Sequence, residues 1–289
     1  MRLGQVLSRP VSANGNDFRR IHIFIKMKEA IKSLTYNAID FLTRGRGIRR
    51  RICGFDVRFP VRYSRYYPAD YEPELFQFLE HNCQPGATFL DCGAHIGFFS
   101  VVASQLVGEE GRVVSFEPMP SVRAVLVLMD TIALNKCRNV NVRPEALSSG
   151  IGKADFFDTG EVGSNANSLV QQERHHRKTC VSLTTLDAVR QEMKLKIDCA
   201  KIDVEGAEYD LLIGAAETIS KDRPQFFLSL HPQAIHSSGA SLDMIWDLLE
   251  SYSLVVKKGE VKISRETFIS QTDLFDVVCI PDSAKNVLR

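Results

Sequence analysis

The chain has 289 residues, of which 44% are hydrophobic and 25% charged, enough to bury one large core or two modest ones. This composition excludes disorder as the default state, and no apolar run reaches the ~18 residues that a membrane-spanning helix needs. The formal net charge of +1 conceals an uneven distribution, because residues 1–65 hold 15 Lys or Arg against 4 Asp or Glu.

The seven cysteines and the first residues indicate a soluble, cytoplasmic protein. The cysteines are odd in number, scattered along the chain, and never form a CxxC pair. The first residues lack the compact apolar core and cleavage-site pattern of a secretory signal. We therefore expect reduced thiols and no structural zinc.

Residues 1–47 are predicted to form a basic, amphipathic helical extension. Such a helix can lie on an anionic membrane surface, but more often it packs on its own domain or on a sister subunit, which is the interpretation we favour. Nucleic acid is not an expected partner, because aromatic residues do not interleave with the basic ones until "VRYSRYYPADY", which is better interpreted as a rim of the substrate entrance. The apolar positions at helical spacing are Phe24, Met27, Ile31, Leu34, Ala38 and Phe41.

Residues 48–289 alternate between strand and helix patterns, and we predict that they form one catalytic domain. A hairpin over residues 49–63 and a helix with Pro73 near its first turn come first. Seven strands follow, with helices between most of them and an extra hairpin from residues 153–158 and 179–187. The strands are expected at residues 88–92, 112–118, 140–147, 198–206, 225–232, 253–258 and 273–281.

This alternation predicts an α/β fold, namely a doubly wound, mostly parallel seven-stranded sheet with an N-terminal helical and hairpin extension. Helices are expected on both faces of the sheet. They are predicted at residues 69–82, 99–107, 121–136, 207–220 and 241–252.

The stretch "LDCGAHIGFFS" turns from the first of these strands into a helix. Glycine permits both the sharp turn and a close backbone approach to a ligand, which suits Gly93 and Gly97. A dinucleotide fingerprint would need glycine where His95 stands. In addition, Asp91 would repel a phosphate but attract a cation such as an α-ammonium group. The motif therefore predicts a ligand that presents positive charge here.

A second carboxylate, Glu117, ends the next strand in "VVSFEP". A carboxylate in this place can accept hydrogen bonds from both hydroxyls of a ribose. Each motif has a structural explanation of its own, since Asp91 could cap the helix and Pro118 could merely end the strand. Together, however, Asp91 and Glu117 describe an amino acid joined to a nucleoside, and S-adenosylmethionine is such a ligand.

Two further carboxylates, Asp203 and Glu205, end the fourth strand in "KIDVEGAEYDLL". Glu205 or the nearby Glu208 could cap the helix that follows, or Asp203 and Glu205 could act in catalysis at the strand end, where sites of open α/β sheets gather. His231 in "SLHP" ends the fifth strand. Methyl transfer to an alcohol needs a base, and the candidates are His231 and one of Asp203 or Glu205.

The runs "YEPELFQFL", "FLDCGAHIGFFS", "VVSFEPMP", "VRPEALSS", "TTLDAV" and "KIDVEGAEYDLL" resemble the FkbM family of S-adenosylmethionine-dependent methyltransferases, from about Gly54 to His231. The resemblance implies a Rossmann-like class I methyltransferase fold whose last strand is antiparallel, and mostly O-methylation of hydroxyls on secondary metabolites or sugars. It also implies that Asp203 and Glu205 face the reacting centre. The positions implied to bind the cofactor are Asp91, Gly93, Ala94 and Gly97 for the methionine part, Glu117 with Pro118 for the ribose, and Glu145 and Ala146 for the adenine.

Two other classes of protein remain open on the sequence alone. In a metal-dependent enzyme, Asp203, Glu205 and His231 would bind magnesium or manganese, although our favoured interpretation has no metal. A non-catalytic binding protein on the same fold is the second alternative, and the intact Asp91 and Glu117 argue against it. Homo-oligomerisation is compatible with either interpretation.

Overall fold

The computed structural model describes residues 15–118, 123–159, 167–173 and 177–282. The chain divides into two compact units, residues 1–47 and residues 48–289. The first contains the long helix α1 (Gly15–Thr43), on which Phe41 is exposed, whereas the side chain of Phe24 lies outside the described residues. In the described part of the chain, no helix is both long and apolar enough to cross a membrane. The binding partner of α1 and the cellular compartment therefore stay predictions.

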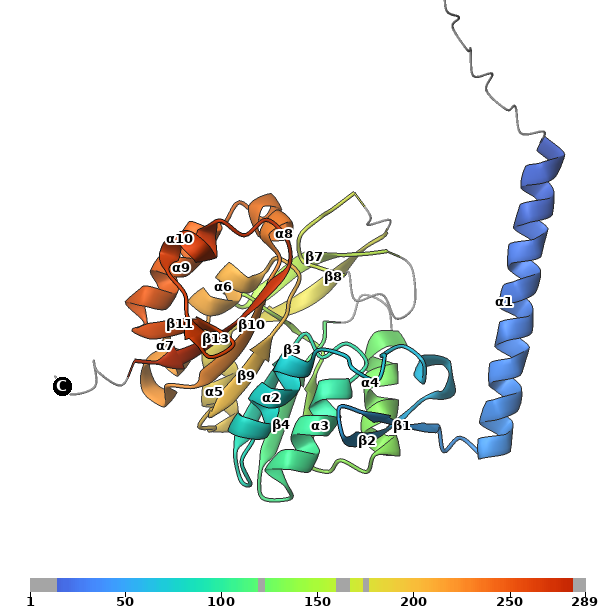
Figure 1. Cartoon of the computed structure of the whole chain (residues 1–289), viewed down its shortest axis with the longest axis horizontal. Helices are drawn as coiled ribbons and strands as arrows, with labels where there is room; N and C mark the ends of the chain where they lie inside the picture. Colours follow the sequence, from blue (N-terminus) through green and yellow to red (C-terminus); the bar gives the residue numbers. More distant parts are fainter. Residues whose placement is uncertain (1–14, 119–122, 160–166, 174–176, 283–289) are drawn as a thin grey trace, which may run out of the picture. The chain divides into compact units, whose positions relative to one another are not determined.

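An eight-stranded sheet forms the centre of the second unit, in the order β12-β11-β13-β10-β9-β3-β4-β5 (Figure 1). From β10 to β5 the strands are parallel, whereas β13 is antiparallel to both of its neighbours. The predicted doubly wound, mostly parallel sheet is thus confirmed. The strands are β3 (Thr88–Cys92), β4 (Arg112–Phe116), β5 (Val140–Arg143), β9 (Cys199–Ile202), β10 (Gln225–Leu230), β11 (Leu254–Lys258), β12 (Val261–Lys262) and β13 (Phe275–Pro281).

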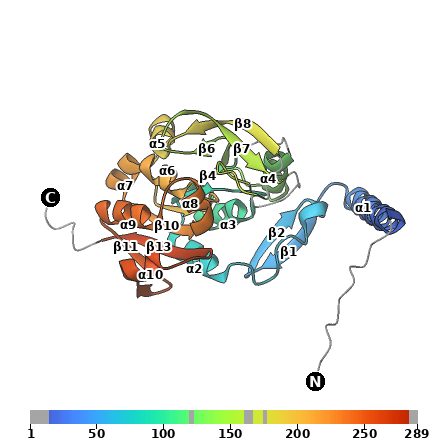
Figure 2. The same ribbon diagram turned by 90° about the horizontal axis from the view of Figure 1, so that it is seen from above.

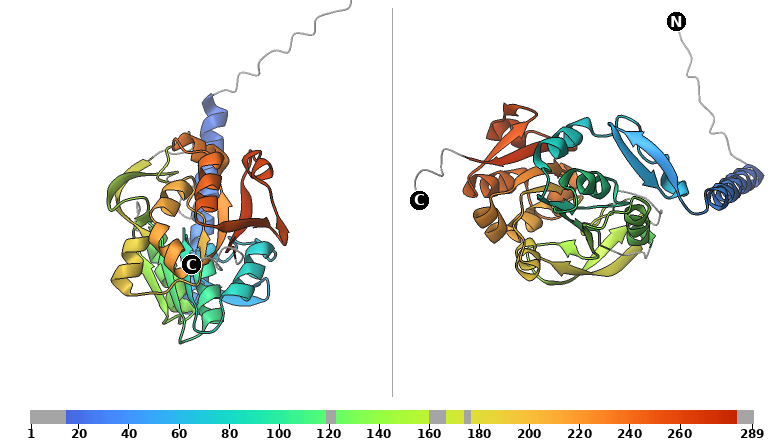
Figure 3. Two further views of the ribbon diagram at one scale, coloured as in Figure 1. Left: turned by 90° about the vertical axis from the view of Figure 1, so that its left-hand side faces the viewer. Right: turned by 90° about the horizontal axis from the view of Figure 1, so that it is seen from below.

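Helices cover both faces of this sheet because its strands are apolar on both sides (Figures 2 and 3). Successive side chains of a strand point to opposite faces, so Phe89 packs with α2 and α3, and Leu90 packs with α5, α6 and α9. The helices are α2 (Pro73–Asn82), α3 (Phe98–Val107), α4 (Arg123–Leu134), α5 (Leu186–Met193), α6 (Glu208–Ile213), α7 (Ala216–Asp222), α8 (Pro232–Ser237), α9 (Leu242–Ser251) and α10 (Arg265–Ile269).

The helix predicted over residues 207–220 is in fact two helices, α6 and α7. Gly214 lies between them, where a side-chain Cβ would come within 2.1 Å of the carbonyl oxygen of Ser148. The backbone therefore passes close to the chain that follows β6, and the close approach accompanies the break between the helices. The apolar pattern continues through both helices, which explains why the sequence suggested one.

Two smaller sheets flank the central one. The predicted N-terminal hairpin is β1 (Ile48–Ile52) with β2 (Phe55–Phe59), and its apolar residues join the core beside α3. The strand predicted over residues 140–147 divides, because only β5 belongs to the central sheet. Its continuation, β6, pairs with the extra hairpin, which is coloured light green to yellow in Figure 3. The members of this second sheet are β6 (Ala146–Leu147), β7 (Gly152–Asp158) and β8 (Arg177–Thr184).

The packing of β10 yields a stability prediction. Leu228 is 0% exposed in the middle of this strand. Leu228→Ala should lower the free energy of unfolding by about 2–5 kcal/mol, because it removes buried apolar atoms and leaves a cavity. Chemical denaturation measures this loss. Leu274→Ala is the matched control, because Leu274 is 61% exposed and its truncation should cost less than about 0.5 kcal/mol. Equal losses in the two variants would contradict the placement of β10 in the core.

Candidate active site

A cavity opens at the carboxyl ends of β3, β4 and β9, and the space between protein atoms there, open solvent included, is about 640 Å³. Phe156, Asn167 and Leu169 also line the cavity, and they come from the second sheet and the loop beside it. The predicted site residues that line it are Gly93, Glu117, Pro118, Glu145, Ala146, Asp203 and Glu205.

The turn between β3 and α3 presses against the end of β9. Gly93 has a φ of 84°, and a Cβ on it would lie 1.9 Å from the backbone oxygen of Asp203. Only glycine is compatible with both the left-handed backbone and this close approach. The N–H groups of Gly93 and Ala94 donate to the carbonyl oxygen of Phe116, so they tie the turn to β4. Gly97 packs against Leu128 of α4 and does not line the cavity.

Glu117 lies where the ribose carboxylate was predicted, at the end of β4. It is 8% exposed, it lines the cavity, and its Oε2 accepts a hydrogen bond from the backbone N–H of His95 at 2.7 Å. Burial raises the pKa of Glu117 to about 7, although the His95 hydrogen bond and the charge of Lys201 act to lower it. A ligand that donates hydroxyl hydrogen bonds would stabilise the ionised form of this carboxylate.

Asp91 lies deeper than the sequence suggested. It is 0% exposed, it does not line the cavity, and its Oδ2 accepts a hydrogen bond of 2.6 Å from Ser100. Its Oδ1 lies 3.7 Å from Nζ of Lys201 and has no hydrogen-bond partner among the described residues. Burial raises the pKa of Asp91. Contact between Asp91 and a cofactor ammonium group therefore stays a prediction.

Lys201 of β9 was not predicted from the sequence to belong to the site. It is 3% exposed, and its Nζ donates to the carbonyl oxygen of Gly93 at 2.9 Å and forms an ion pair with Asp203 at 3.2 Å. Burial alone would lower the pKa of Lys201, but Asp203 and Asp91 raise it above its ordinary value. A lysine inside an apolar strand pattern could have drawn attention, since lysine is rarely buried without a partner.

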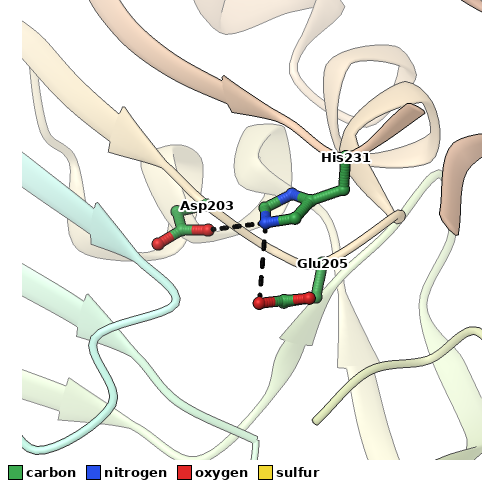
Figure 4. Close-up of side chains that lie close together, drawn as sticks. All are labelled: Asp203, Glu205 and His231. Atoms are coloured by element: carbon green, nitrogen blue, oxygen red, sulfur yellow. Dashed lines mark ion pairs between the residues drawn. The ribbon is translucent and has the colours of Figure 1, made fainter. Parts of the chain in front are cut away.

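The three predicted catalytic side chains meet beside the cavity (Figure 4). Nε2 of His231 lies 3.6 Å from Oδ1 of Asp203 and 3.5 Å from Oε1 of Glu205. Its other nitrogen, Nδ1, lies 2.9 Å from the fully buried Glu208. Burial would lower the pKa of His231, but the Glu208 hydrogen bond and the neighbouring carboxylates raise it to about 9.

The two carboxylates of this cluster differ in their surroundings. Burial would raise the pKa of Asp203, but the charges of Lys201 and His231 lower it below its ordinary value. Of the two residues that could cap α6, Glu208 accepts a hydrogen bond from the N–H of Gly206, just before that helix, and the role of Glu205 stays a prediction. Glu205 has a left-handed backbone, with a φ of 53°.

The remaining predicted positions, Glu145 and Ala146, also line the cavity. Glu145 is held by a salt bridge of 2.7 Å to Arg143, and Arg143 also pairs with Glu192. Ala146 is buried beside it. These contacts orient the wall at which the family resemblance places the adenine, and the contact with adenine itself stays a prediction.

The tyrosine-rich segment over residues 61–71 lies against the turn between β3 and α3, which we call the cofactor turn. The rings of Tyr66 and His95 are 5.1 Å apart, and the hydroxyl of Tyr67 lies 3.3 Å from Nδ1 of His95. Tyr67 is only 5% exposed, so it belongs to the core and not to an entrance rim, whereas Tyr66 is 36% exposed. The segment thus supports His95, which lines the cavity.

The residues present fit S-adenosylmethionine in two respects. Glu117 presents a carboxylate to the cavity, and Gly93 lines the cavity without a side chain, which permits a close backbone approach to a ligand. The order of the sheet, with β13 reversed between β10 and β11, is that of class I methyltransferases. Fold and site together therefore define an S-adenosylmethionine-dependent methyltransferase.

Comparison with known families agrees. The model of the family described as "Methyltransferase FkbM domain" matches residues 91–254. This match covers more than half of the chain, and the chain belongs to the FkbM methyltransferase family. The predicted family and cofactor are thus confirmed.

Individual relatives are more distant. The AMB antimetabolite synthetase AmbE of Pseudomonas aeruginosa is 26% identical over 230 residues, which are 68% of this chain but only 10% of that protein. The methyltransferase FkbM of Methylobacillus flagellatus KT is 16% identical with a TM-score of 0.43, over 68% of this chain and 44% of that one. The chain therefore spans well under two thirds of either relative.

A further solved structure is Aeropyrum pernix fibrillarin, which contains bound S-adenosyl-L-methionine. It is 12% identical, with a TM-score of 0.42, over 69% of this chain and 68% of that one. Similarity at this level adds nothing to what the strand order already shows about the fold.

Glu117 makes cofactor binding depend on pH. If the ribose binds to the ionised carboxylate, affinity falls as pH drops through the pKa of about 7. We expect S-adenosylhomocysteine to bind about tenfold more weakly at pH 6 than at pH 8, measured by titration calorimetry. Glu117→Gln should weaken binding at pH 8 by about tenfold and remove most of the pH dependence.

The control for this measurement is Glu110→Gln, which changes an exposed glutamate in the turn after α3. It should leave both the affinity and its pH dependence unaltered. A Glu117→Gln protein that binds as tightly as the parent at pH 8 would exclude the ribose assignment.

Proposed function

We propose that the chain methylates a hydroxyl group of a small molecule, such as a secondary metabolite or a sugar. The observation that carries the proposal is the arrangement of His231, whose Nδ1 lies against the buried Glu208 and whose Nε2 faces the end of β9 beside the cavity. A histidine held in this manner is typical of a group that moves a proton.

Glu208 selects the form of the imidazole. A buried carboxylate 2.9 Å from Nδ1 accepts a hydrogen bond from it, so the proton of neutral His231 belongs on Nδ1. Nε2 then has a free electron pair beside Asp203 and Glu205, which line the cavity. Nε2 is therefore the basic atom of this cluster.

Bound S-adenosylmethionine supplies an electrophilic methyl group on a positively charged sulfur, and transfer of this methyl to a hydroxyl oxygen leaves S-adenosylhomocysteine and one proton. His231 receives that proton on Nε2 as the new C–O bond forms. Asp203 and Glu205 then stabilise the imidazolium, because their carboxylates lie within 3.6 Å of Nε2. Alignment of the acceptor beside these groups contributes much of the rate, since the leaving group is already good.

A direct test uses S-adenosylmethionine labelled in its methyl group, together with a panel of sugars and other hydroxylated small molecules. We expect label on an acceptor oxygen, and His231→Ala should lower that rate by about 10² or more. The affinity for S-adenosylhomocysteine should stay within about twofold, because His231 does not line the cavity. In the parent enzyme the rate should rise with pH towards about 9, since the protonated imidazole cannot accept a proton.

His236→Ala, an exposed histidine on α8, is the matched control and should behave as the parent enzyme does. Label found only on nitrogen or carbon would overturn O-methylation. A His231→Ala enzyme with the parental rate would instead exclude His231 as the base, and O-methylation would still hold.

A metal-dependent reaction is the second candidate, and one observation favours it. Ligand atoms of Asp203, Glu205 and His231 all lie within 4.8 Å of one another. Glu208 on Nδ1 is also the kind of partner that orients a metal-binding histidine. Magnesium or manganese would suit this set of oxygen and nitrogen donors, and either metal could polarise the acceptor hydroxyl.

Chelation separates the two candidates. We expect methyl transfer to persist after dialysis against EDTA, because in the proposed reaction neutral His231 accepts the hydroxyl proton without a metal. The measurement is the labelled-methyl assay before and after dialysis, and again after addition of Mn²⁺. Loss of activity that Mn²⁺ restores would establish the metal-dependent reaction in place of the histidine base.

A further inference from the structure

The site contains a buried cation that the reaction described above does not use. Lys201 lies on β9, between β3 and β10, with 3% of its surface exposed. Lysine is among the residues least often buried, because removing an ammonium group from water is costly unless it is paired. The contacts of this side chain therefore need an explanation.

The ammonium group of Lys201 bridges two parts of the site. Its Nζ donates to the carbonyl oxygen of Gly93 at 2.9 Å, and it lies 3.2 Å from Oδ2 of Asp203. Oδ1 of Asp91 is 3.7 Å away, and the ring centroid of Phe99 is 5.8 Å away. In this way one side chain contacts the cofactor turn, the carboxylate beside the reacting centre, and the aspartate beneath both.

The fold by itself does not require this arrangement. Replacing a buried ion pair with apolar residues is often neutral or stabilising, because the attraction barely offsets the loss of hydration. On the same face of the sheet, Phe89, Cys199 and Phe227 are apolar and fully or almost fully buried, and Asp91 is the charged neighbour that pairs with Lys201. An apolar pair at positions 91 and 201 would continue that surface, so packing alone does not account for the lysine and the aspartate.

We propose that Lys201 is a positioning residue that joins the cofactor turn at Gly93 to Asp203. It does not touch the reacting atoms. It holds the Gly93 carbonyl and the Asp203 carboxylate on one ammonium group, so the two sides of the cavity keep a common geometry. The proposal rests on the cofactor site described above, and it is independent of which group accepts the proton.

Two features make the link effective. The backbones of Gly93 and Asp203 are already in contact, because a Cβ on Gly93 would lie 1.9 Å from the Asp203 oxygen. The N–H of Asp203 also donates to the carbonyl oxygen of Cys92, which precedes the turn. Since backbone contacts fix the main chain here, the ammonium group serves to orient the Gly93 carbonyl and the Asp203 side chain.

The experiment measures affinity for S-adenosylhomocysteine by titration calorimetry and needs no methyl acceptor. All variants carry Asp91→Asn, so that removal of Lys201 does not leave a fully buried carboxylate without a cation. Lys201→Met and Asp203→Asn are then introduced separately and together. Melting temperatures of all four proteins are recorded alongside.

We expect Lys201→Met and Asp203→Asn each to weaken binding about tenfold in this background. The protein with both changes should bind within about twofold of the weaker single change, because the two side chains act as one unit. A purely structural lysine would shift the melting temperature alone. Affinity within about twofold of the background after Lys201→Met, or independent and multiplying losses, would overturn the proposal.

A distant ion pair provides the control. Arg190 and Asp222 join α5 to α7 through two hydrogen bonds of 2.6 and 2.7 Å, and neither lines the cavity. The combined change Arg190→Met and Asp222→Asn should lower the melting temperature without altering affinity. If Lys201→Met does not fold, Lys201→Gln replaces it in the same cycle, since its amide keeps one donor for the buried acceptors. Failure of O-methylation would leave all these affinities unchanged.

Discussion

The site depends on one close contact, between the turn that follows β3 and the end of β9. Gly93 approaches the backbone of Asp203 so closely that no side chain fits between them. This contact places the turn expected to hold the methyl donor next to the carboxylates expected to face the acceptor. Lys201 lies directly beneath it and contacts both sides. A methyltransferase needs its two substrates in line, and this backbone contact fixes the spacing between the turn and the end of β9.

Charge is the second organising feature. Carboxylates outnumber cations around the cavity, and the excess suits a ligand that carries positive charge, as a sulfonium compound does. Burial and mutual repulsion keep the pKa of Glu117 and of Asp91 high, whereas Lys201 and His231 keep that of Asp203 low. The groups concerned are the carboxylates of Asp91, Glu117, Asp203, Glu205 and Glu208, and the cations Lys201 and His231.

The surrounding fold separates stability from chemistry. Apolar side chains on both faces of the sheet form the core, and the polar groups gather at the carboxyl ends of its parallel strands. Loops at those ends can vary without disturbing the core, which is how one fold serves many acceptors. In this chain the second sheet supplies part of the cavity wall through Phe156. Differences in this wall would change which acceptor or cofactor fits.

The sequence by itself determined the strand and helix alternation, the family, the cofactor class and seven of the fifteen described residues that line the cavity, because glycines and carboxylates that follow buried strands in this order form a specific pattern. Only the tertiary structure decided which of these groups touch. It buried Asp91 out of the cavity, placed Glu208 on His231, split the helix at Gly214 and revealed Lys201 as a bridge. The place of Asp91 and the bridge through Lys201 depend on the register between β3 and β9, which pairs these two residues. Residues 110 positions apart carry no local pattern that announces such a pairing, because it arises from the packing of whole strands.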